Sequence, residues 1–408
     1  MKSLRDEFFR SPSPHRKRSW AGKPCAIEEL SGERLHGKTA NTIQAGALMN
    51  VGLIIYGDLE TLTGGYMYDR RLVDYLRSQG DRVEVISLAW RNYGRHLTDN
   101  LSRHLLRRLQ EAKFDVLIQD ELNHPSLFLV NLWLKYRIQY PIVTLVHLLR
   151  RSESHPAWLK RVYGAVERKY LTAVDGAIFN CNTTRAAVKQ LIGRDIPGVV
   201  AYPGRDHLHY EFSSEEIAQR ARRPGPMRVI FLANVVPGKG LDTLIEALSK
   251  MPHDSWRLMV VGSLTMAPSY SQSIRNQIDR AGLADHVEMM GAVPNDEIPG
   301  YLIRNHVLVV PSRYEALGIV YLEAMGFGLP VIATAAGGAH EIISHGEVGF
   351  LTPPGDANML AQYLRQINQD RERLIEMSLA AYERISTHPT WDQSFGRIRN
   401  FLQSLIRD

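Results

Sequence analysis

Short β-rich apolar runs alternate with amphipathic stretches along most of this chain, and this alternation narrows its fold more than any other feature. In the first half, the runs predicted as strands lie near 51–56, 83–87, 116–119, 142–146 and 177–180. A second series contains five such runs, which begin at Val229, Leu258, Val287, Val307 and Val331. Strands that alternate with helices form parallel sheets covered by helices. We therefore expect an α/β protein with two Rossmann-like, doubly wound parallel sheets.

The length of the chain indicates two domains. A single hydrophobic core stops growing at about 250–300 residues, whereas this chain has 408. Two such sheets facing each other leave a cleft, and ligands bind at the carboxyl ends of the strands. The predicted divisions are a flexible polar tail at 1–48, an N-terminal domain at 49–212, a linker at 213–226, a C-terminal domain at 227–390 and a last helix at about 391–408 that packs back across the first domain.

The composition excludes several classes of protein. Hydrophobic residues make up 44% of the chain and charged residues 23%, as in soluble globular proteins. The two cysteines, Cys25 and Cys181, lie far apart and encode neither a disulfide framework nor a zinc cluster. No apolar stretch approaches the roughly 20 residues that cross a bilayer. The polar first residues also lack the apolar stretch of a secretory signal, so we expect a cytoplasmic protein.

The formal net charge of +6 suits an anionic partner such as a nucleotide, a lipid surface or nucleic acid. Basic residues crowd several predicted helices of the first half, namely Arg103, Arg107, Arg108, Lys160, Arg161, Arg168 and Lys169. A solvated helix face is the simpler interpretation, and a peripheral membrane contact is the alternative.

Three segments imitate nucleotide or metal motifs without the context that those motifs need. GERLHGKT at 32–39 matches the phosphate-loop pattern but lies in the polar tail, without a preceding strand. GKGLDT at 238–243 lacks the third glycine of the dinucleotide pattern, and the histidines of HEIISH at 340–345 are five apart rather than four. No Asp-x-Asp sequence occurs either. We therefore expect no cofactor and no obligatory metal.

The segment that carries the chemistry begins at Val310 and contains two glutamates. Glu315 lies in the loop after a predicted strand, and Glu323 lies within the helix that follows. The backbone amides between them are those of Leu317, Gly318, Ile319 and Val320. Unpaired amides at a helix N-terminus bind anions such as phosphate. Carboxylates are good acceptors for sugar hydroxyls, so the pattern fits a ligand with hydroxyls on both sides of a phosphate.

Together with GGAHE at 337–341 and GEVGFLTPPGD at 346–356, this segment resembles the retaining glycosyltransferases of family four, which have the GT-B fold. The resemblance covers nearly everything from Met49 onward. It implies that Glu315 faces the transferred sugar and that Glu323 accepts from the ribose hydroxyls. It also implies that the amides of Leu317, Gly318, Ile319 and Val320 contact the diphosphate.

The resemblance assigns further residues outside this segment. Lys239 matches the lysine that neutralises the diphosphate, and His147, at a strand's carboxyl end, matches a position near the donor sugar. Gly64 and Gly65 resemble a glycine loop that closes over the cleft. The predicted catalytic residues are therefore His147, Glu315 and Lys239.

The chain departs from the family pattern in two segments. Ala233 and Asn234 stand where many relatives carry Gly-Arg, so Asn234 is the candidate donor contact there and a second cation is missing. Lys239 would then carry more of the leaving-group charge, or Arg313 would assist. Leu317 replaces an aromatic residue.

The resemblance implies a hexosyltransferase that moves a sugar from a nucleotide-diphosphate-sugar donor to a hydroxyl of a glycan, lipid or small-molecule acceptor. Retention of anomeric configuration and independence from metal are implied in the same way. We expect no nucleic-acid partner. The sequence is also compatible with other functions: a sugar-nucleotide epimerase or a phosphorylase on the same fold, or a protein that binds the donor without turnover.

Overall fold

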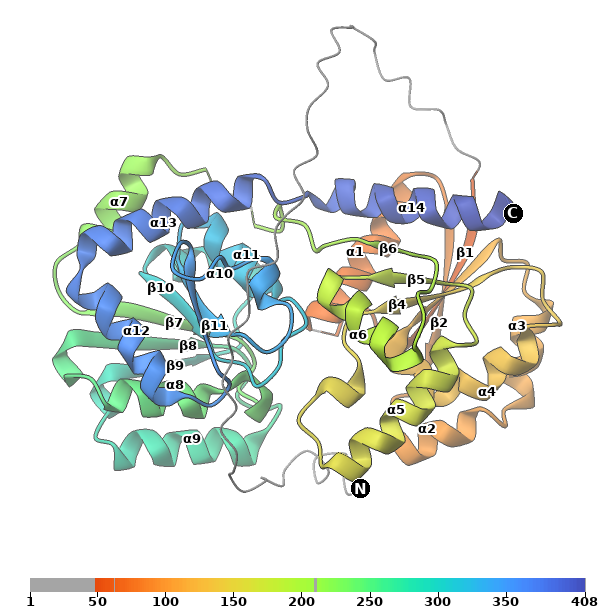
Figure 1. Cartoon of the computed structure of the whole chain (residues 1–408), viewed down its shortest axis with the longest axis horizontal. Helices are drawn as coiled ribbons and strands as arrows, with labels where there is room; N and C mark the ends of the chain where they lie inside the picture. Colours follow the sequence, from red (N-terminus) through yellow and green to blue (C-terminus); the bar gives the residue numbers. More distant parts are fainter. Residues whose placement is uncertain (1–47, 62, 209–210, 408) are drawn as a thin grey trace, which may run out of the picture.

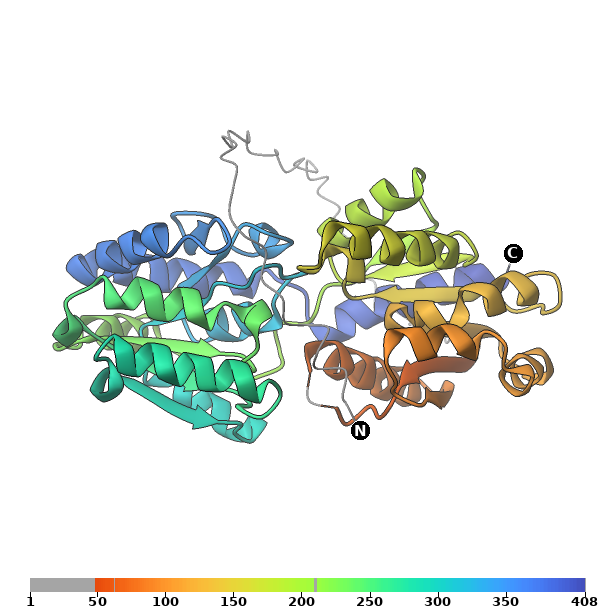
Figure 2. The ribbon, with the colours of Figure 1, turned by 90° about the horizontal axis from the view of Figure 1, so that it is seen from below.

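The computed structural model describes residues 48–61, 63–208 and 211–407. The predicted tail, apart from Leu48, and the phosphate-loop-like segment at 32–39 lie outside these residues. The described chain forms two six-stranded sheets whose paired strands all run parallel (Figure 1). Helices cover both faces of each sheet (Figure 2). The predicted fold class is thus confirmed.

The first sheet has the strand order β2-β1-β3-β4-β5-β6. Its strands are β1 Asn50–Tyr56, β2 Arg82–Leu88, β3 Val116–Asp120, β4 Ile142–Val146, β5 Gly176–Phe179 and β6 Gly198–Val200. Its helices are α1 Gly64–Ser78, α2 Tyr93–Asp99, α3 Arg103–Glu111, α4 His124–Leu134, α5 Ala157–Leu171 and α6 Asn182–Ile192, with short 3-10 turns η2 Glu121–Asn123 and η3 Arg150–Ser152. The central strands β3, β4 and β5 are buried along their whole length, as expected for a parallel sheet covered on both faces.

The second sheet has the strand order β12-β11-β10-β7-β8-β9. Its strands are β7 Met227–Leu232, β8 Trp256–Val261, β9 Val287–Gly291, β10 Val307–Val310, β11 Val331–Thr334 and β12 Gly349–Thr352. Its helices are α8 Leu241–Ser249, α9 Pro268–Arg280, α10 Ile298–Ile303, α11 Ile319–Gly326, α12 Ala357–Gln369 and α13 Arg371–Ser386. Short 3-10 turns follow several strands, among them η4 Pro237–Lys239 and η8 Ala339–Glu341. The sequence prediction missed only the short edge strands β6 and β12.

The segment predicted as a linker, 213–226, is instead largely helical. It contains α7 Ser214–Arg222, which begins with a capping box between Ser213 and Glu216. One face of α7, including Ile217, is buried, and the helix packs against α13. The polar composition is therefore that of a surface helix, and the Ser-x-x-Glu spacing was the signal for it.

The last helix, α14 Trp391–Arg407, returns to the first sheet and lies along it (Figure 1). Trp391 and Phe395 belong to the same buried cluster as Tyr68 of α1. Arg399 donates two hydrogen bonds to Asp81, at 2.8 and 3.0 Å, and so fixes the helix beside the start of β2. No helix among the described residues is long and apolar enough to cross a membrane.

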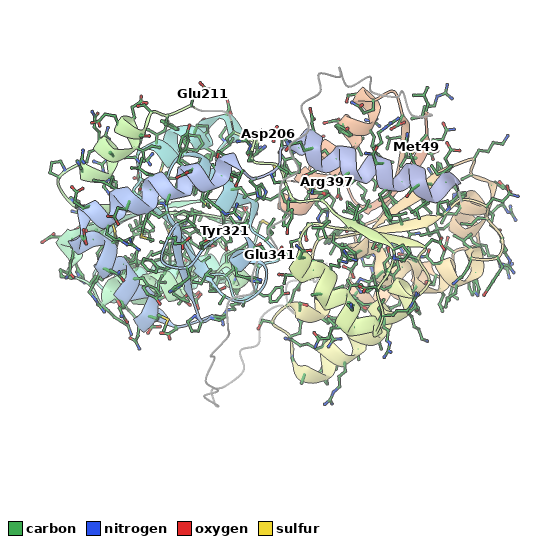
Figure 3. The ribbon with its side chains drawn as sticks, turned by 45° about the horizontal axis from the view of Figure 1, so that its top comes forward. Met49, Asp206, Glu211, Tyr321, Glu341 and Arg397 are labelled. Atoms are coloured by element: carbon green, nitrogen blue, oxygen red, sulfur yellow. The ribbon has the colours of Figure 1, made fainter. Side chains whose placement is uncertain are left out.

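A carboxylate of the second half caps a helix of the first half. Glu341, labelled in Figure 3, accepts from the backbone amides of Asn182 and Thr183 at 3.0 and 2.6 Å, in the first turn of α6. The hydroxyls of Thr183 and Tyr202 donate to it at 2.5 and 2.6 Å. Burial alone would raise the pKa of Glu341, but these hydrogen bonds outweigh it and lower the pKa. The contact therefore favours an ionised carboxylate at a positive helix end.

We expect Glu341→Ala to lower the free energy of unfolding by about 1–3 kcal/mol, because it removes hydrogen bonds to a charged group and a helix cap. Urea denaturation measures the change, and Glu347→Ala, an exposed glutamate on the same segment, is the control. A lowered pKa gives stability that is present above the ordinary value of 4.5 and is lost as the pH falls through the lower folded value. The difference between wild type and variant should therefore shrink in acid, and equal stability of the two at neutral pH would contradict the assignment.

Candidate functional site

Glu315 and Lys239 meet at the carboxyl ends of two neighbouring strands. Glu315 follows β10 and Lys239 follows β7, and Nζ of Lys239 lies 2.5 Å from Oε2 of Glu315. The hydroxyl of Ser312 donates to the same oxygen at 3.0 Å. The backbone of Glu315 bonds to Ala336 and Gly338, which fixes its position beside the loop after β11. The structure thus brings together two of the three predicted catalytic residues.

The N-terminus of α11 lies between the two glutamates, as predicted. Gly318 is its N-cap, with φ +88°, and no side chain caps the helix. A Cβ on Gly318 would lie 2.3 Å from the ring of Tyr321, so both the backbone angle and the packing require glycine. Ile319 and Val320 are half-buried in the first turn, whereas Leu317 is buried in the core of the second half.

Glu323 lies in a more enclosed position than Glu315. Its side chain is 11% exposed, and Oε1 lies 3.5 Å from Nε2 of His207, whose Nδ1 is 2.7 Å from Nη2 of Arg71. Burial raises the pKa of Glu323 to about 7, although Arg71 opposes the rise. Burial and the charge of Arg71 lower the pKa of His207 to about 4, so this pair is not a salt bridge at neutral pH. Arg71 and His207 had no signal in the sequence.

Gly64 and Gly65 belong to a helix and not, as predicted, to a closing loop. They form the first turn of α1, whose N-cap is Thr63. A Cβ on Gly64 would lie 3.5 Å from Cδ1 of Ile319, so the N-termini of α1 and α11 come close where the two halves meet. Two positive helix ends at one place favour an anionic ligand.

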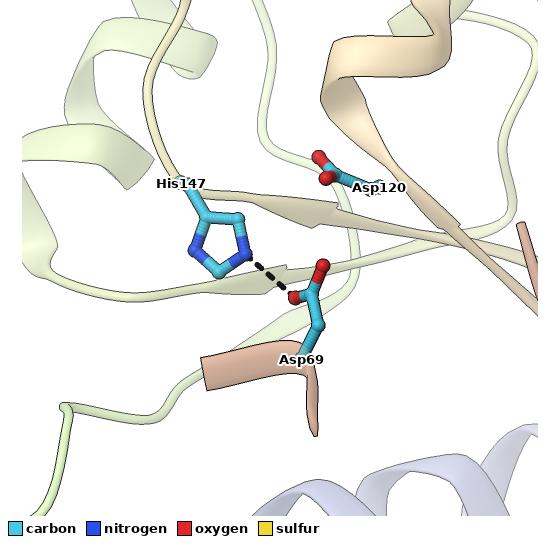
Figure 4. A group of neighbouring side chains, drawn as sticks. All are labelled: Asp69, Asp120 and His147. Carbon is cyan, nitrogen blue, oxygen red and sulfur yellow. Dashed lines mark hydrogen bonds and ion pairs between the residues drawn. The ribbon is translucent and has the colours of Figure 1, made fainter. Parts of the chain in front are cut away.

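His147 follows β4, as predicted, and lies against Gly65, where a Cβ would come within 3.4 Å of its ring. Its Nε2 is 2.8 Å from Oδ1 of the buried Asp69 on α1, and Asp120 at the end of β3 lies beside them (Figure 4). Burial lowers the pKa of His147, but the charge and hydrogen bond of Asp69 outweigh this and raise it. Asp120 could have been found from the sequence because it directly follows a predicted strand; Asp69, on a helix face, could not.

Asn234 and Arg313 are engaged elsewhere. Oδ1 of Asn234 accepts from the amide of Ser263, which ties the loop after β7 to the loop after β8. Arg313 binds Asp242 at 3.0 Å. Arg313 also donates to the carbonyl of Pro237 at 3.2 Å, in the turn that carries Lys239, so its assistance to Lys239 stays a prediction.

Two groups of acidic and histidine side chains place one potential ligand atom each within 4.8 Å of one another: Asp69, Asp120 and His147, and Glu121, His124 and Glu167. In the first group, Nε2 of the histidine is already bonded to Asp69. In the second, Nδ1 of His124 lies 2.9 Å from the Glu121 carbonyl and Nε2 lies 3.2 Å from the Tyr93 hydroxyl. Because these nitrogens are engaged, hydrogen-bonded networks describe both groups better than metal centres do.

A cavity of about 500 Å³ lies at the other edge of the second sheet, beside the amino-terminal ends of β7, β8 and β9. It is lined by Arg228, Arg257 and Arg304 among others. Ligands of doubly wound sheets bind at the carboxyl ends of strands, so we place the candidate site with Glu315 and Lys239 instead.

Comparison with known proteins agrees with this geometry. Residues 212–384 match the family model described as Glycosyl transferases group 1. This part of the chain is therefore similar to the group 1 glycosyl transferases. The matched range begins just before α7 and contains Glu315, Glu323 and Lys239, so the group 1 domain includes the segment that was predicted as a linker.

Two curated relatives match parts of the chain. The chain is 32% identical over 197 residues to the GDP-mannose-dependent alpha-(1-6)-phosphatidylinositol monomannoside mannosyltransferase of Mycobacterium tuberculosis, covering 46% of this chain and 50% of that protein. It thus spans about half the length of this relative. It is also 25% identical to the glycogen synthase of that organism over 276 residues, or 66% of this chain and 63% of the synthase.

Solved structures show the same two-sheet GT-B fold. Sucrose-phosphate synthase from Thermosynechococcus elongatus matches with a TM-score of 0.75 at 20% identity, covering 88% of this chain and 99% of that one. Anabaena HepE in complex with UDP and glucose matches with a TM-score of 0.68 at 22% identity, covering 87% of this chain and 100% of that one. At these identities the likeness concerns the fold.

We expect Gly318→Ala to destabilise the group 1 domain by about 1–3 kcal/mol, because alanine is strained at positive φ and would clash with the Tyr321 ring. Gly326→Ala is the control in the same helix: a Cβ there meets nothing within 4 Å, and alanine favours the helix by about 1 kcal/mol. Thermal unfolding of both variants measures the difference. Equal melting temperatures would show that Gly318 does not shape the N-terminus of α11.

Proposed function

We propose that this protein is a hexosyltransferase that moves a sugar from a nucleoside-diphosphate donor to an acceptor hydroxyl, with retention of anomeric configuration. The observation that carries the proposal is the meeting of Lys239, Glu315 and the N-termini of α11 and α1 at one place. The group 1 match and the nucleotide-sugar enzymes among the relatives support it. The second half, with α7, would hold the donor, and the first half, with α14, would receive the acceptor.

The geometry suits the departure of a diphosphate. As the glycosidic bond breaks, negative charge grows on the leaving group, and preorganised donors stabilise it best. Lys239 and the two helix N-termini supply a charge and backbone amides there without a metal ion. Glu315 and His147 would face the sugar, and Glu323 would accept from the ribose hydroxyls, as their positions around α11 and β4 allow.

The candidate donors are UDP- and GDP-sugars, and the candidate acceptors include lipids. HepE has been solved with UDP-glucose, and the mycobacterial relative is named for GDP-mannose, so both bases are candidates here. That relative is also named for a phosphatidylinositol acceptor. A lipid acceptor would agree with the outer face of α5, where Trp158 is 64% exposed and Arg161, Val162, Arg168 and Lys169 are exposed as well. This face supports the proposal of a peripheral membrane contact.

The first test is a thermal-shift screen of UDP-, GDP- and ADP-sugars. A ligand at 100 times its Kd adds about 2.7 kcal/mol to the stability of the native state, so the correct donor should raise the melting temperature. Lys239→Ala should reduce that shift, because it removes the cation proposed to meet the diphosphate. Lys250→Ala, at the opposite end of α8, is the matched control and should leave the shift unchanged. No shift with any nucleotide-sugar would overturn the proposal.

The two glutamates should affect different steps. We expect Glu315→Gln to lower kcat by about 100-fold with little change in donor affinity, and Glu323→Gln to raise the donor Kd by about 10-fold. Because burial places the pKa of Glu323 at about 7, its carboxylate is charged above that pH and neutral below it. Donor Kd should therefore rise as the pH falls through about 7 in wild type and stay flat in Glu323→Gln.

Initial-rate kinetics and a calorimetric pH series measure these effects. Wild-type behaviour of both variants would remove the glutamates from the site. Incubation with the donor alone separates the alternatives: an epimerised donor identifies an epimerase, and binding without transfer or hydrolysis across many acceptors identifies a binding protein. Cleavage of a glycan that depends on phosphate identifies a phosphorylase.

A further inference from the structure

The ring of His147 is held from three directions. Its Nε2 lies 2.8 Å from Oδ1 of Asp69, its edge meets the ring of Tyr68 at 77°, and Gly65 lies against its face. The other ring nitrogen, Nδ1, points away from Asp69 (Figure 4). No hydrogen bond to Nδ1 occurs among the residues that the structure describes, and 14% of the side chain is exposed. The ring is therefore fixed by one nitrogen and open at the other.

Asp69 itself is completely buried, and only one of its carboxylate oxygens has a partner. Its Oδ2 is buried without a hydrogen bond within the described part of the chain. The carboxyl group of Asp120 lies close to this oxygen (Figure 4) and is 2% exposed. An unsatisfied buried carboxylate oxygen costs several kcal/mol, so a donor is needed at this place.

A proton on Asp120 meets that need. Oδ1 of Asp120 accepts from the amide of Leu122 at 3.0 Å, which leaves its other oxygen for a proton. Burial, and then the charge of Asp69, raises the pKa of Asp120 to about 8. Asp120 is therefore mostly neutral at pH 7, and its hydroxyl would be a donor for Oδ2 of Asp69, since carboxyl oxygens of the two residues lie within 4.8 Å of each other.

We propose that Asp69 is a positioning residue: its carboxylate keeps a proton on Nε2 of His147 and so presents Nδ1 to the ligand, while a protonated Asp120 supports Asp69 from behind. The role toward a ligand rests on the proposed transferase activity; the protonation pattern does not. When His147 is charged, Nδ1–H donates to a sugar or phosphate oxygen, and when it is neutral, Nδ1 accepts from a hydroxyl.

The groups that face His147 determine how its charge depends on pH. These are Asp69 from α1, Asp120 from β3 and Glu121 from η2, with the neutral phenol of Tyr68 at its edge. Burial lowers the pKa of His147, and Asp69 is the largest influence that raises it. If Asp69 loses its charge, burial prevails and the pKa of His147 should fall below its ordinary value of 6.5.

A titration without substrate tests the pattern directly. Histidine-labelled full-length protein is titrated by NMR, and the His147 signal is assigned by its loss in His147→Gln. We expect the pKa of His147 to fall by about one unit or more in Asp69→Asn, which is a tenfold loss of proton affinity. Asp74→Asn, an exposed aspartate on the same helix, should leave it unchanged. An unchanged pKa in Asp69→Asn would overturn the proposal, whatever the protein transfers.

Kinetics then test the positioning role. An asparagine at position 69 can turn its amide toward Nε2 and so favour the wrong tautomer. We expect Asp69→Asn and His147→Gln each to lower kcat by about 10- to 100-fold, and the double variant to be no slower than His147→Gln alone. Losses that multiply in the double variant would show that Asp69 acts independently of His147 and would overturn the positioning role. Asp74→Asn should have wild-type kcat.

Two substitutions of Asp120 test whether its carboxyl group is protonated. Asp120→Asn retains a donor toward Asp69 and should keep the wild-type melting temperature, whereas Asp120→Ala leaves Oδ2 of Asp69 unpaired and should lower it. Equal behaviour of the two variants would contradict the protonated state. A rise in melting temperature with Mg²⁺ or Mn²⁺ that is lost in Asp120→Asn would identify a cation in place of the proton and overturn this part of the proposal.

Discussion

Both sheets are parallel, and this single constraint brings the candidate site residues of both halves together. In a parallel sheet every strand ends at the same edge, and every following helix begins there. Lys239 and Glu315 follow neighbouring strands of the second sheet, and Asp120 and His147 follow neighbouring strands of the first. The same geometry turns the N-termini of α1 and α11 toward each other. Positive helix ends therefore meet carboxylates that come from both halves of the chain.

The acidic side chains near the site differ in protonation state because their surroundings shift their pKa values differently. Glu341 is ionised because four donors surround it at the start of α6. Asp120 and Glu323 lack such donors, and burial raises the pKa of each, to about 8 and about 7. Glu315, half-buried, is paired with a lysine. Carboxyl groups thus serve as a helix cap (Glu341), an ion-pair partner (Glu315), a buried neutral donor (Asp120) and an acceptor whose charge changes near pH 7 (Glu323), and environment alone decides which.

Much of the fold was accessible from the sequence because apolar periodicity reports buried strands directly. Ten strands were predicted from their apolar runs, whereas β6 (GVV) and β12 (GFLT) are edge strands that begin with glycine and contain only two apolar residues each. The polar segment at 213–226 was misread because α7 buries only a narrow face, although Ser213 and Glu216 encode its cap. Composition was a poorer guide there than spacing.

The sequence predicted only those residues of the candidate site that lie close together along the chain. Glu315, Gly318 and Glu323 lie within one short segment, so their pattern survives in the sequence. Asp69 meets His147 across 78 residues, and Arg71 meets His207 across 136, and neither pair has a spacing that a helix or strand period could reveal. Tertiary packing alone makes these pairs.

The side chains that the proposed reaction needs contact one another within the protein. Lys239 pairs with Glu315, and Glu323 faces His207, which is neutral at pH 7. A ligand with a diphosphate and free hydroxyls offers a better partner to each: the phosphates to the lysine, the hydroxyls to the carboxylates. The Lys239–Glu315 pair is partly buried, at 32% and 17% side-chain exposure, so desolvation offsets much of its attraction and a ligand that satisfies both partners can replace it. A donor that offers these partners can therefore replace the internal contacts of Lys239 and Glu323.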